Sequence, residues 1–375
     1  MESARGRPVG MVDSRALADV ARAYQAAGPF VSVYLVTEPG IENAGPTAAL
    51  HWKALRQDLV EQGAPTGALE ALDALVPDAH QQGRTLVAAA TSEGVAVVRH
   101  EAEPARHDIG WVDALPRLGP VIEWEQAAIP HLVVLADRAG ADVIAARDGR
   151  SDTLLVGPND GRDPGLRRSA PGGWSQRRYQ QRAENLWEER AGEVADAVES
   201  AVGDVGARLV VVAGDVRAVA FLREALPARM ADLVHEVAGG RSPDGSTDEI
   251  AAETVRLVAS VAAEDTVAYL RRFKEEAGRG GRATEGVEAT LAALREARVD
   301  VLLVHDDPGD ERRACFGPAG HLVAAEAGVL VDLGVDQPSD ARLVDVAIRG
   351  AFATGAGVRV IPDVVGEGIG ALLRH

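Results

Sequence analysis

The residues best suited to chemistry lie between Arg167 and Arg182, where a glycine pair and five arginines occur without an acidic residue, although the chain has a formal net charge of -18. From the glycine pair onward the segment reads Gly-Gly-Trp-Ser-Gln-Arg-Arg-Tyr. Ser175 stands where an N-cap is expected, so a helix is predicted to begin directly after the glycines. Free N–H groups at a helix start bind phosphate, and so do guanidinium groups. The predicted RNA-binding residues are Arg167, Arg168, Gly172, Gly173, Trp174, Gln176, Arg177, Arg178 and Arg182.

A purely structural interpretation of this segment is also open. Trp174 and Tyr179 have the spacing of a hydrophobic staple around Ser175, which would make the segment a well-formed helix start. The charge of the segment argues against a purely structural role. Arg177 and Arg178 lie in the first predicted turn, where the helix macrodipole disfavours each exposed cation by roughly 0.3 to 1 kcal/mol. A bound anion would offset this cost. Trp174 is also free to stack on unpaired bases, as aromatic residues do in RNA contacts.

Other groups of chemically capable residues give weaker signals. Glu123 and Glu125 flank Trp124 in a segment where a strand would put both carboxylates on one face, and a solvated edge is favoured there over acid–base catalysis. A second group contains residue types that bind metals, but its spacing matches no zinc motif. Its members are His305, Asp306, Asp307, Cys315 and His321. We therefore expect no metal and no cofactor.

The charge and composition of the chain limit its partners. A net charge of -18 opposes diffuse binding to nucleic acid or anionic lipid, so any RNA contact must be local. The single cysteine, Cys315, excludes an internal disulfide framework. No apolar run of about 18 residues occurs, and the first ten residues contain no signal-peptide core. We expect a cytoplasmic protein without a membrane partner.

The elements that would position the arginines follow from hydrophobic periodicity. At 375 residues the chain exceeds the size at which a single core keeps growing, so two or three domains are expected. In the first block, helices are predicted over 14–25, 47–61 and 68–76, and strands over 30–36, 85–90 and 95–98. The proline-containing stretch from 111 to 130 is predicted to be irregular and to end this block.

The second block contains the arginine-rich segment. Strands predicted over 131–136, 142–146 and 153–156 are separated by hairpin turns and should form an antiparallel meander. Residues 157–173 lack apolar periodicity, and a loop that long in a compact domain is usually functional or disordered. Then come helices predicted over 175–202, 218–226 and 246–276, and strands over 209–213 and 233–237.

A glycine cluster at 277–282 predicts a hinge before the third block. Beyond it, helices are predicted over 284–297, 341–352 and 368–373, and strands over 299–305, 329–332 and 358–361. The predicted fold class is α/β, with three consecutive α/β domains. These cover 1–124, then 125–278 with the Gly172-Gly173 loop and the arginine-rich helix, and finally 279–375.

The chain resembles the archaeo-eukaryotic peptide-chain release factors and Pelota. The string that begins at Gly172 and runs into the predicted helix with Arg182, Glu184 and Ala195 resembles the Gly-Gly-Gln loop and following helix of their middle domain. Residues 366–374 are similar to the closing segment of their C-terminal domain, and residues 30–35 to the first strand of their N-terminal domain. The order of the three domains matches as well, with a ribosomal-protein-like α/β domain last. The resemblance implies the bacterial branch of this superfamily, including actinobacterial members and Balon-type ribosome hibernation factors.

Two departures from the family pattern bear on activity. The family glutamine that positions the hydrolytic water follows the glycines directly, but Trp174 holds that place here and Gln176 comes two residues later. The Asn-Ile-Lys-Ser loop that reads stop codons is absent, so codon-specific termination is not expected. The resemblance then implies a ribosome-associated translation factor that occupies the A site in hibernation or rescue. Its middle-domain loop would lie near the peptidyl-transferase centre and contact rRNA or the tRNA acceptor end.

Two alternatives stay open. In the first, Gln176 and the glycine backbone orient water against an ester bond, and the protein is a peptidyl-tRNA hydrolase. A binding protein is favoured over this enzyme. In the second, the fold serves away from ribosomes as a scaffold or in signalling. An elongation-factor GTPase is a further candidate partner, and a monomer is expected off the ribosome.

Overall fold

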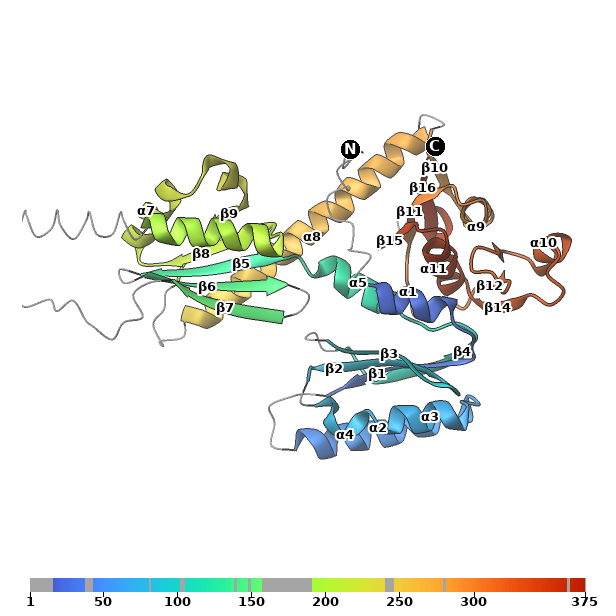
Figure 1. Ribbon diagram of the computed structural model, residues 1–375. Helices are drawn as coiled ribbons and strands as arrows, with labels where there is room; N and C mark the ends of the chain where they lie inside the picture. Colours follow the sequence, from blue (N-terminus) through green and yellow to red (C-terminus); the bar gives the residue numbers. More distant parts are fainter. Residues whose placement is uncertain are drawn as a thin grey trace, which may run out of the picture. The chain divides into compact units, whose positions relative to one another are not determined.

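The computed structural model describes most of the chain, and its fold is mixed α/β (Figure 1), which confirms the predicted fold class. The described residues are 16–37, 43–80, 82–101, 105–137, 140–147, 150–156, 191–239, 246–278, 281–362 and 365–374. They contain an N-terminal sheet, a middle sheet and two C-terminal sheets, in that order along the chain. The predicted domain boundaries at 124/125 and 278/279 stay predictions.

The N-terminal sheet is antiparallel with the strand order β3-β2-β1-β4. Its strands are β1 (Phe30–Val36), β2 (Thr85–Thr91), β3 (Gly94–Glu101) and β4 (Ile109–Asp113). Helices α2 (Ala44–Glu61), α3 (Thr66–Asp73) and α4 (Val76–Ala79) cover one face, while α1 (Ala18–Gln25) covers the other (Figure 1). The buried residues of α2 recur at helical spacing, at Ala48, Trp52, Leu55 and Leu59, which is why this amphipathic segment packs as a helix.

The stretch from 111 to 130, predicted to be irregular, is largely regular, so this prediction is wrong. It contains the end of β4 and a helix, α5 (Gly119–Ala127). Leu115, Leu118, Val121 and Ile122 pack tightly into the hydrophobic core, which explains why this stretch adopts regular structure. Prolines at the ends of the helix do not prevent it, because a proline in the first turn of a helix loses no intrahelical hydrogen bond.

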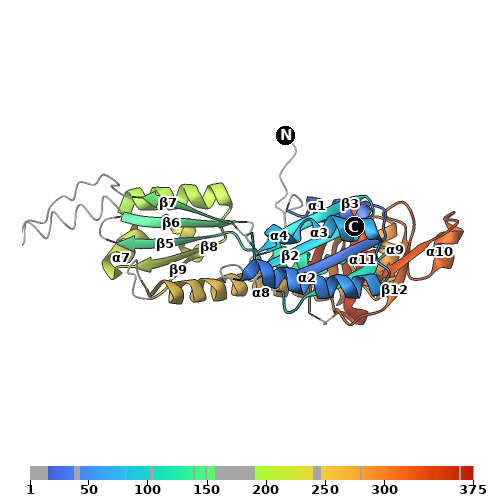
Figure 2. The ribbon, with the colours of Figure 1, turned by 90° about the horizontal axis from the view of Figure 1, so that it is seen from below.

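The middle sheet has the order β7-β6-β5-β8-β9 (Figure 2). The strands β5 (His131–Asp137), β6 (Gly140–Arg147) and β7 (Arg150–Val156) form the antiparallel meander that the hairpin spacing predicts. The strands β8 (Leu209–Gly214) and β9 (Val234–Glu236) then add in parallel on the other side of β5. Alternate residues of β5 are buried, so one face of this sheet carries the core.

Helices complete the middle part of the chain. The described part of one helix covers 191–205, followed by α7 (Val216–Ala225), the short 3-10 helix η1 (Ala228–Leu233) and α8 (Ser246–Gly278). Val194, Val198, Val219 and Leu222 share one buried cluster with β5 and β8. The helix over 191–205 and α7 therefore pack on the same face of the sheet.

The C-terminal part contains two sheets. The larger has the order β10-β16-β11-β15, and the smaller has the order β13-β12-β14. The larger sheet consists of β10 (Ala283–Glu285), β16 (Ile369–Leu373), β11 (Val299–Val304) and β15 (Gly357–Val360); the smaller consists of β13 (Val323–Ala324), β12 (Arg313–Phe316) and β14 (Ser339–Arg342). The helices here are α9 (Val287–Arg295), α10 (Ala327–Asp332) and α11 (Leu343–Ala353), with a short 3-10 helix, η2 (Gly366–Gly368).

Two predictions in this part are wrong. Residues 368–373, predicted as a helix, contain β16, which lies between β10 and β11 and buries all five of its residues. Residues 329–332, predicted as a strand, lie in α10, which buries Leu330 and leaves Val329 and Val331 exposed. Short apolar runs do not distinguish a buried strand from a helix, so pairing with distant strands decides the outcome.

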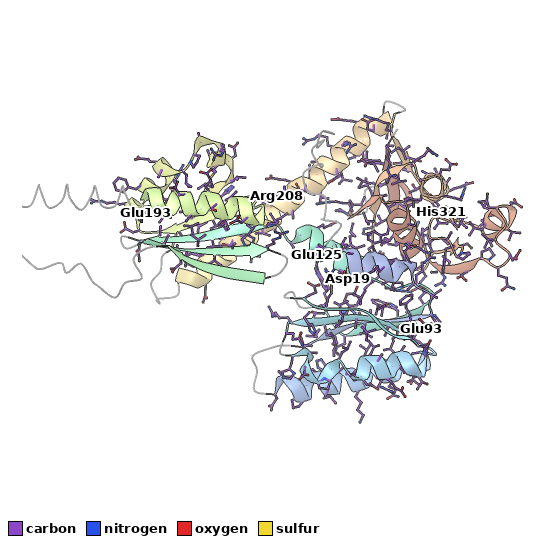
Figure 3. The ribbon with its side chains drawn as sticks, viewed as in Figure 1. Asp19, Glu93, Glu125, Glu193, Arg208 and His321 are labelled. Carbon is purple, nitrogen blue, oxygen red and sulfur yellow. The ribbon has the colours of Figure 1, made fainter. Side chains whose placement is uncertain are left out.

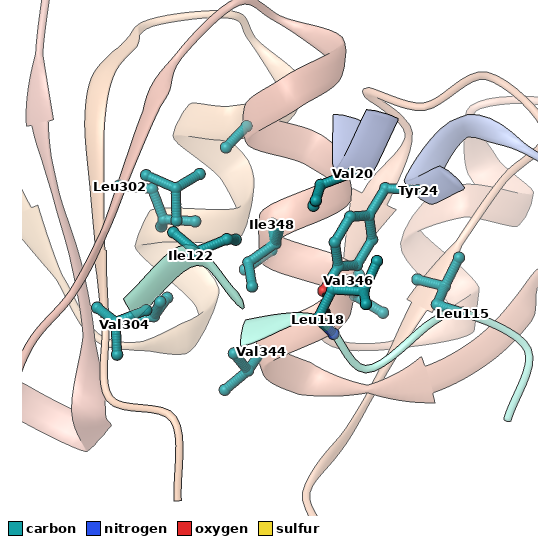
Figure 4. Packing of buried hydrophobic residues seen from close by; sticks show 14 of the residues in the cluster. Val20, Tyr24, Leu115, Leu118, Ile122, Leu302, Val304, Val344, Val346 and Ile348 are labelled. Atoms are coloured by element: carbon teal, nitrogen blue, oxygen red, sulfur yellow. Dashed lines mark hydrogen bonds between the residues drawn. The ribbon is translucent and has the colours of Figure 1, made fainter. Parts of the chain in front are cut away.

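The described residues divide into two compact units, one made of Met1–Gln126 with Asp265–His375 and the other of Ala127–Glu264. In the first unit, the N-terminal and C-terminal parts share one hydrophobic core. Figure 4 shows Val20 and Tyr24 of α1 together with Val344, Val346 and Ile348 of α11. These segments, more than 300 residues apart in sequence, fold as one body.

Candidate functional site

The nine predicted RNA-binding residues, Gln176 among them, all lie in 157–190, outside the described residues. The structure therefore defines the two ends between which this segment is held. It leaves the described chain after Val156, the last residue of β7, and returns at Ala191, at the beginning of the described helix over 191–205. Both ends belong to the middle unit.

The first end lies at the edge of the middle sheet where the parallel strands β5 and β8 finish. Ala136 near the end of β5 pairs with Gly214 at the end of β8, and Val156 pairs with Ala141 directly beyond the β5–β6 turn (Figure 2). In open α/β sheets this carboxyl edge is where ligands bind. The segment with the arginines thus begins at the edge that is chemically accessible in folds of this kind.

The carboxyl edge is built by close backbone packing. Gly214 has a φ of 140°, and its Cα lies so near β5 that an added Cβ would lie 2.8 Å from the carbonyl carbon of Ala136. The next backbone N–H, of Asp215, donates to the Ala136 carbonyl oxygen at 3.0 Å. The Asp215 side chain then caps α7, accepting from the N–H groups of Arg217 and Ala218 at 3.1 and 3.3 Å. Glycine is required at 214, and the carboxylate fixes the helix that follows.

The second end is held by the helix over 191–205. Its buried residues Ala191, Val194, Ala195 and Val198 pack into the core of the middle unit. The charged side chains of this helix are all carboxylates, and Glu193 is labelled in Figure 3. They are Glu193, Asp196, Glu199 and Asp204. The described helix that follows the arginine segment is therefore acidic.

The carboxylates Glu123 and Glu125 do not form the pair that a strand would give, so the prediction of a shared strand face is wrong. They lie on α5, where positions two apart point in different directions. Glu125 forms an ion pair with Arg99, whose guanidinium also contacts Asp19 at 2.6 Å. Figure 3 labels Glu125 and Asp19. Burial raises the pKa of Glu123, and the nearby negative charge of Asp306 raises it further.

The residues of metal-binding type are used structurally. Asp306 forms an ion pair with Arg342 at 2.5 Å, and His305 Nδ1 lies 3.1 Å from the carbonyl oxygen of Ile361. Burial raises the pKa of the Cys315 thiol, which lies on β12. Within the described ranges, no three His, Cys, Asp or Glu side chains are grouped to hold a metal ion. In the same part of the chain, no helix is long and apolar enough to cross a membrane.

Sequence reasoning missed a buried polar cluster in the first unit. Tyr24 of α1 donates its hydroxyl hydrogen to Asp345 of α11 at 2.9 Å, although the residues are 321 positions apart. Arg342 and Asp306 complete the cluster, and all but a few per cent of each of these four side chains is buried. The only local signal was the spacing of Arg342 and Asp345, which is common on exposed helices.

The middle of the chain matches a known protein family. Residues 130–279 match the sequence model of a family described as bacterial archaeo-eukaryotic release factor family 2. This segment is similar to that family, and the predicted resemblance to the archaeo-eukaryotic release factor superfamily is confirmed. The matched residues include β5 to β9, α7, all of α8 and the arginine-rich segment between β7 and the helix over 191–205. No curated protein matches the chain.

Several solved structures are similar to the chain at low sequence identity. An archaeal translation termination factor, aRF1, is 16% identical over 98% of this chain and all of its own, with a TM-score of 0.27. Pelota from Archaeoglobus fulgidus is 18% identical over 77% of this chain and 79% of its own, with a TM-score of 0.37. Dom34 from S. cerevisiae, described as a translation termination-like factor, is 9% identical over 100% and 98%, with a TM-score of 0.37.

Proposed function

We propose that this protein is a ribosome-associated translation factor that occupies the A site in hibernation or rescue. The match of residues 130–279 to a release-factor family is the observation that carries the proposal. The arginine-rich segment falls inside the matched region, between the described residues Val156 and Ala191. Its loop would contact rRNA or the tRNA acceptor end near the peptidyl-transferase centre.

The charge distribution supports a contact restricted to this segment. Five arginines and no carboxylate lie between Arg167 and Arg182, whereas the described helix that follows carries four carboxylates and no cation. Repulsion from the acidic helix disfavours RNA on other surfaces, while phosphate contacts at the arginines release counterions. Together these effects favour a single binding orientation.

The proposal is tested by replacing Arg177, Arg178 and Arg182 with alanine and measuring co-sedimentation with ribosomes as a function of salt. If each arginine contacts one phosphate, the slope of log affinity against log salt should become shallower by roughly 2 to 3. A matched control removes three arginines of the same unit that are well exposed, with side-chain exposures of 60%, 68% and 74%. These are Arg223, Arg229 and Arg256. Equal affinity of the two triple variants and the wild type would contradict the proposal.

A hydrolase is the second candidate, and the presence of Gln176 three residues after Gly173 is the observation that favours it. Water oriented by this amide and by glycine N–H groups could attack the ester bond of peptidyl-tRNA. The assay adds purified protein to ribosomes that carry peptidyl-tRNA and compares the wild type with Gln176→Ala. Release that disappears in the variant supports the hydrolase, and no release by either protein supports the binding factor. Absence from ribosome pellets in both growing and starved cells would instead support the non-ribosomal scaffold.

A further inference from the structure

At the contact between α1 and α11, two buried carboxylates lie beside the guanidinium of Arg342. Asp345 is 1% exposed, and Asp306 and Arg342 lie beside it with side-chain exposures of 7% and 4%. Arg342 reaches both carboxylates, at 2.5 Å from Asp306 and 3.8 Å from Asp345. Two carboxylates that share one buried guanidinium cannot both stay ionised without cost, so one of them favours binding a proton.

The geometry selects Asp345 as the group that binds the proton. Asp306 has the shorter ion pair with Arg342, and it lies against Gly119 at the N-terminus of α5, where a negative charge is stabilised. Asp345 accepts a hydrogen bond on Oδ1 from Tyr24, but its Oδ2 has no hydrogen-bond partner among the described residues. A proton on Oδ2 would remove an uncompensated buried charge.

The other charged groups near Asp345 do not remove this imbalance. Arg117, in the segment before α5, pairs with Asp113 at 3.6 Å, and Asp113 also binds Arg313 at 2.9 Å. The Arg117 charge lowers the pKa of Asp345, but by less than the Arg342 charge does. Arg349, one turn further along α11, donates to carbonyl oxygens, including that of Tyr24. Burial raises the pKa of Tyr24 well above its usual value, so this hydroxyl stays a donor. Burial likewise raises the pKa of Asp345 to about 7, and the Arg342 charge opposes that rise only in part.

We propose that the contact between α1 and α11 is a proton-operated joint, in which a proton on Asp345 holds α1 against α11 and loss of that proton favours release of α1. The helix α1 has eight residues; it buries Val20, Ala23 and Tyr24, and Asp19 forms an ion pair with Arg99 of β3. Its release hydrates the Asp345 carboxylate, which relieves the cost of burial. The joint connects the N-terminal sheet to the C-terminal part of the same unit, so acidification would stiffen this unit. This regulation is independent of the proposed ribosome contact.

Proton linkage fixes the direction and size of the effect. In the closed joint the pKa of Asp345 is about 7, whereas a carboxyl released into solvent has the ordinary value of 3.8. Between pH 3.8 and pH 7, opening of the joint therefore releases a proton. In this range the equilibrium constant for opening should fall about tenfold for each pH unit below 7. Above pH 7 the carboxyl is ionised in both states, and the equilibrium should become independent of pH.

The test is amide hydrogen exchange of the full-length protein from pH 5 to pH 8, corrected for the intrinsic pH dependence of exchange. The protection of α1 should rise about tenfold per pH unit as the pH falls below 7, relative to α2 as internal reference. Asp345→Asn, which mimics the neutral acid and still accepts from Tyr24, should give high protection at every pH. Asp332→Asn, at an exposed position on α10, is the matched control and should behave as the wild type.

Two results would overturn the proposal. One is corrected protection of α1 that does not change with pH in the wild type, a result that needs no variant to fold. The other is the same pH dependence in Asp345→Asn as in the wild type, which would assign the linkage to another group. Carbon-13 spectra of the aspartate carboxyls supply an independent measurement, in which one buried carboxyl should titrate near pH 7.

Discussion

Replacing Gly214 with alanine should selectively destabilise the middle unit, because this glycine lies where β8 comes closest to β5. The added methyl carbon would lie 2.8 Å from the Ala136 carbonyl carbon and 3.0 Å from its backbone nitrogen. Backbone atoms in the middle of a sheet cannot turn aside as a flexible side chain can, so the strand ends must separate. Gly214 also has a φ of 140°, which an L-residue adopts only with strain.

The magnitude follows from these two effects. Forcing a residue with a side chain into such a backbone conformation costs on the order of 1 to 3 kcal/mol. Separating the strand ends breaks the hydrogen bond from the Asp215 N–H to the Ala136 carbonyl, at 3.0 Å, and a hydrogen bond of this kind contributes about 1 kcal/mol. We therefore expect the opening free energy of β8 to fall by about 3 kcal/mol. That is roughly a hundredfold increase in amide exchange where exchange follows the opening equilibrium.

The assay is hydrogen exchange of the full-length protein, read separately for peptides of β8 and of β1. The first unit has its own core, so β1 exchange should stay unchanged in Gly214→Ala. Gly203→Ala is the matched control: this exposed helical glycine has no atom within 4 Å of an added Cβ, and the change should stabilise the helix by up to about 1 kcal/mol. Unaltered β8 exchange in Gly214→Ala, or equal loss of protection in β1, would refute the reasoning.

Three further predictions test other parts of the fold. Asp215→Ala removes the side-chain cap of α7 and should lower the stability of the middle unit by about 1 kcal/mol, measured from β8 exchange in denaturant. Gly119→Ala would place a methyl carbon 2.7 Å from Asp306 Cγ, displacing the carboxylate that pairs with Arg342; exchange should increase in β11 while β8 stays protected. Hydrogen bonding from Arg312 lowers the pKa of Asp310 below 3.8, so this carboxylate contributes stability above about pH 4 that is lost as the pH falls. In Asp310→Asn the unfolding midpoint should consequently depend less on pH below about 4, and an unchanged acid profile would contradict this assignment.

Elements with a strong local pattern could be predicted from the sequence. The β1 prediction matches residue for residue at 30–36, since a run of β-branched and aromatic residues favours a strand. The β5–β6–β7 meander follows from hairpin turns only a few residues long. The failure at β16 has a different cause. Its five apolar residues fit either structure, and pairing with β10 and β11, which are distant in sequence, decides for a strand.

The candidate site likewise has a part that could be predicted from the sequence and a part that could not. The arginine segment stands out in the sequence because five cations without a carboxylate contrast with an acidic chain, and the family match covers it, but its placement stays a prediction. What could not be predicted is how other charged residues find their partners. The carboxylate of Glu125 is bound by an arginine on β3, a strand that precedes α5 by two elements. A charge that looks solvated in sequence is therefore committed once the fold brings its partner to it.

The joint between α1 and α11 is the clearest example of polar residues whose partners are distant in sequence. Tyr24 reads in sequence as one more apolar position of an amphipathic helix, and Asp345 as a polar position in the first turn of another. Each interpretation is locally correct, yet neither reveals that both side chains become completely buried against each other. Replacing a buried polar group by an apolar one of similar shape often costs little, so packing alone does not require a carboxylate at 345. Its presence there, with a second carboxylate beside it and one guanidinium between them, makes the contact responsive to protons in a way that an apolar contact would not be.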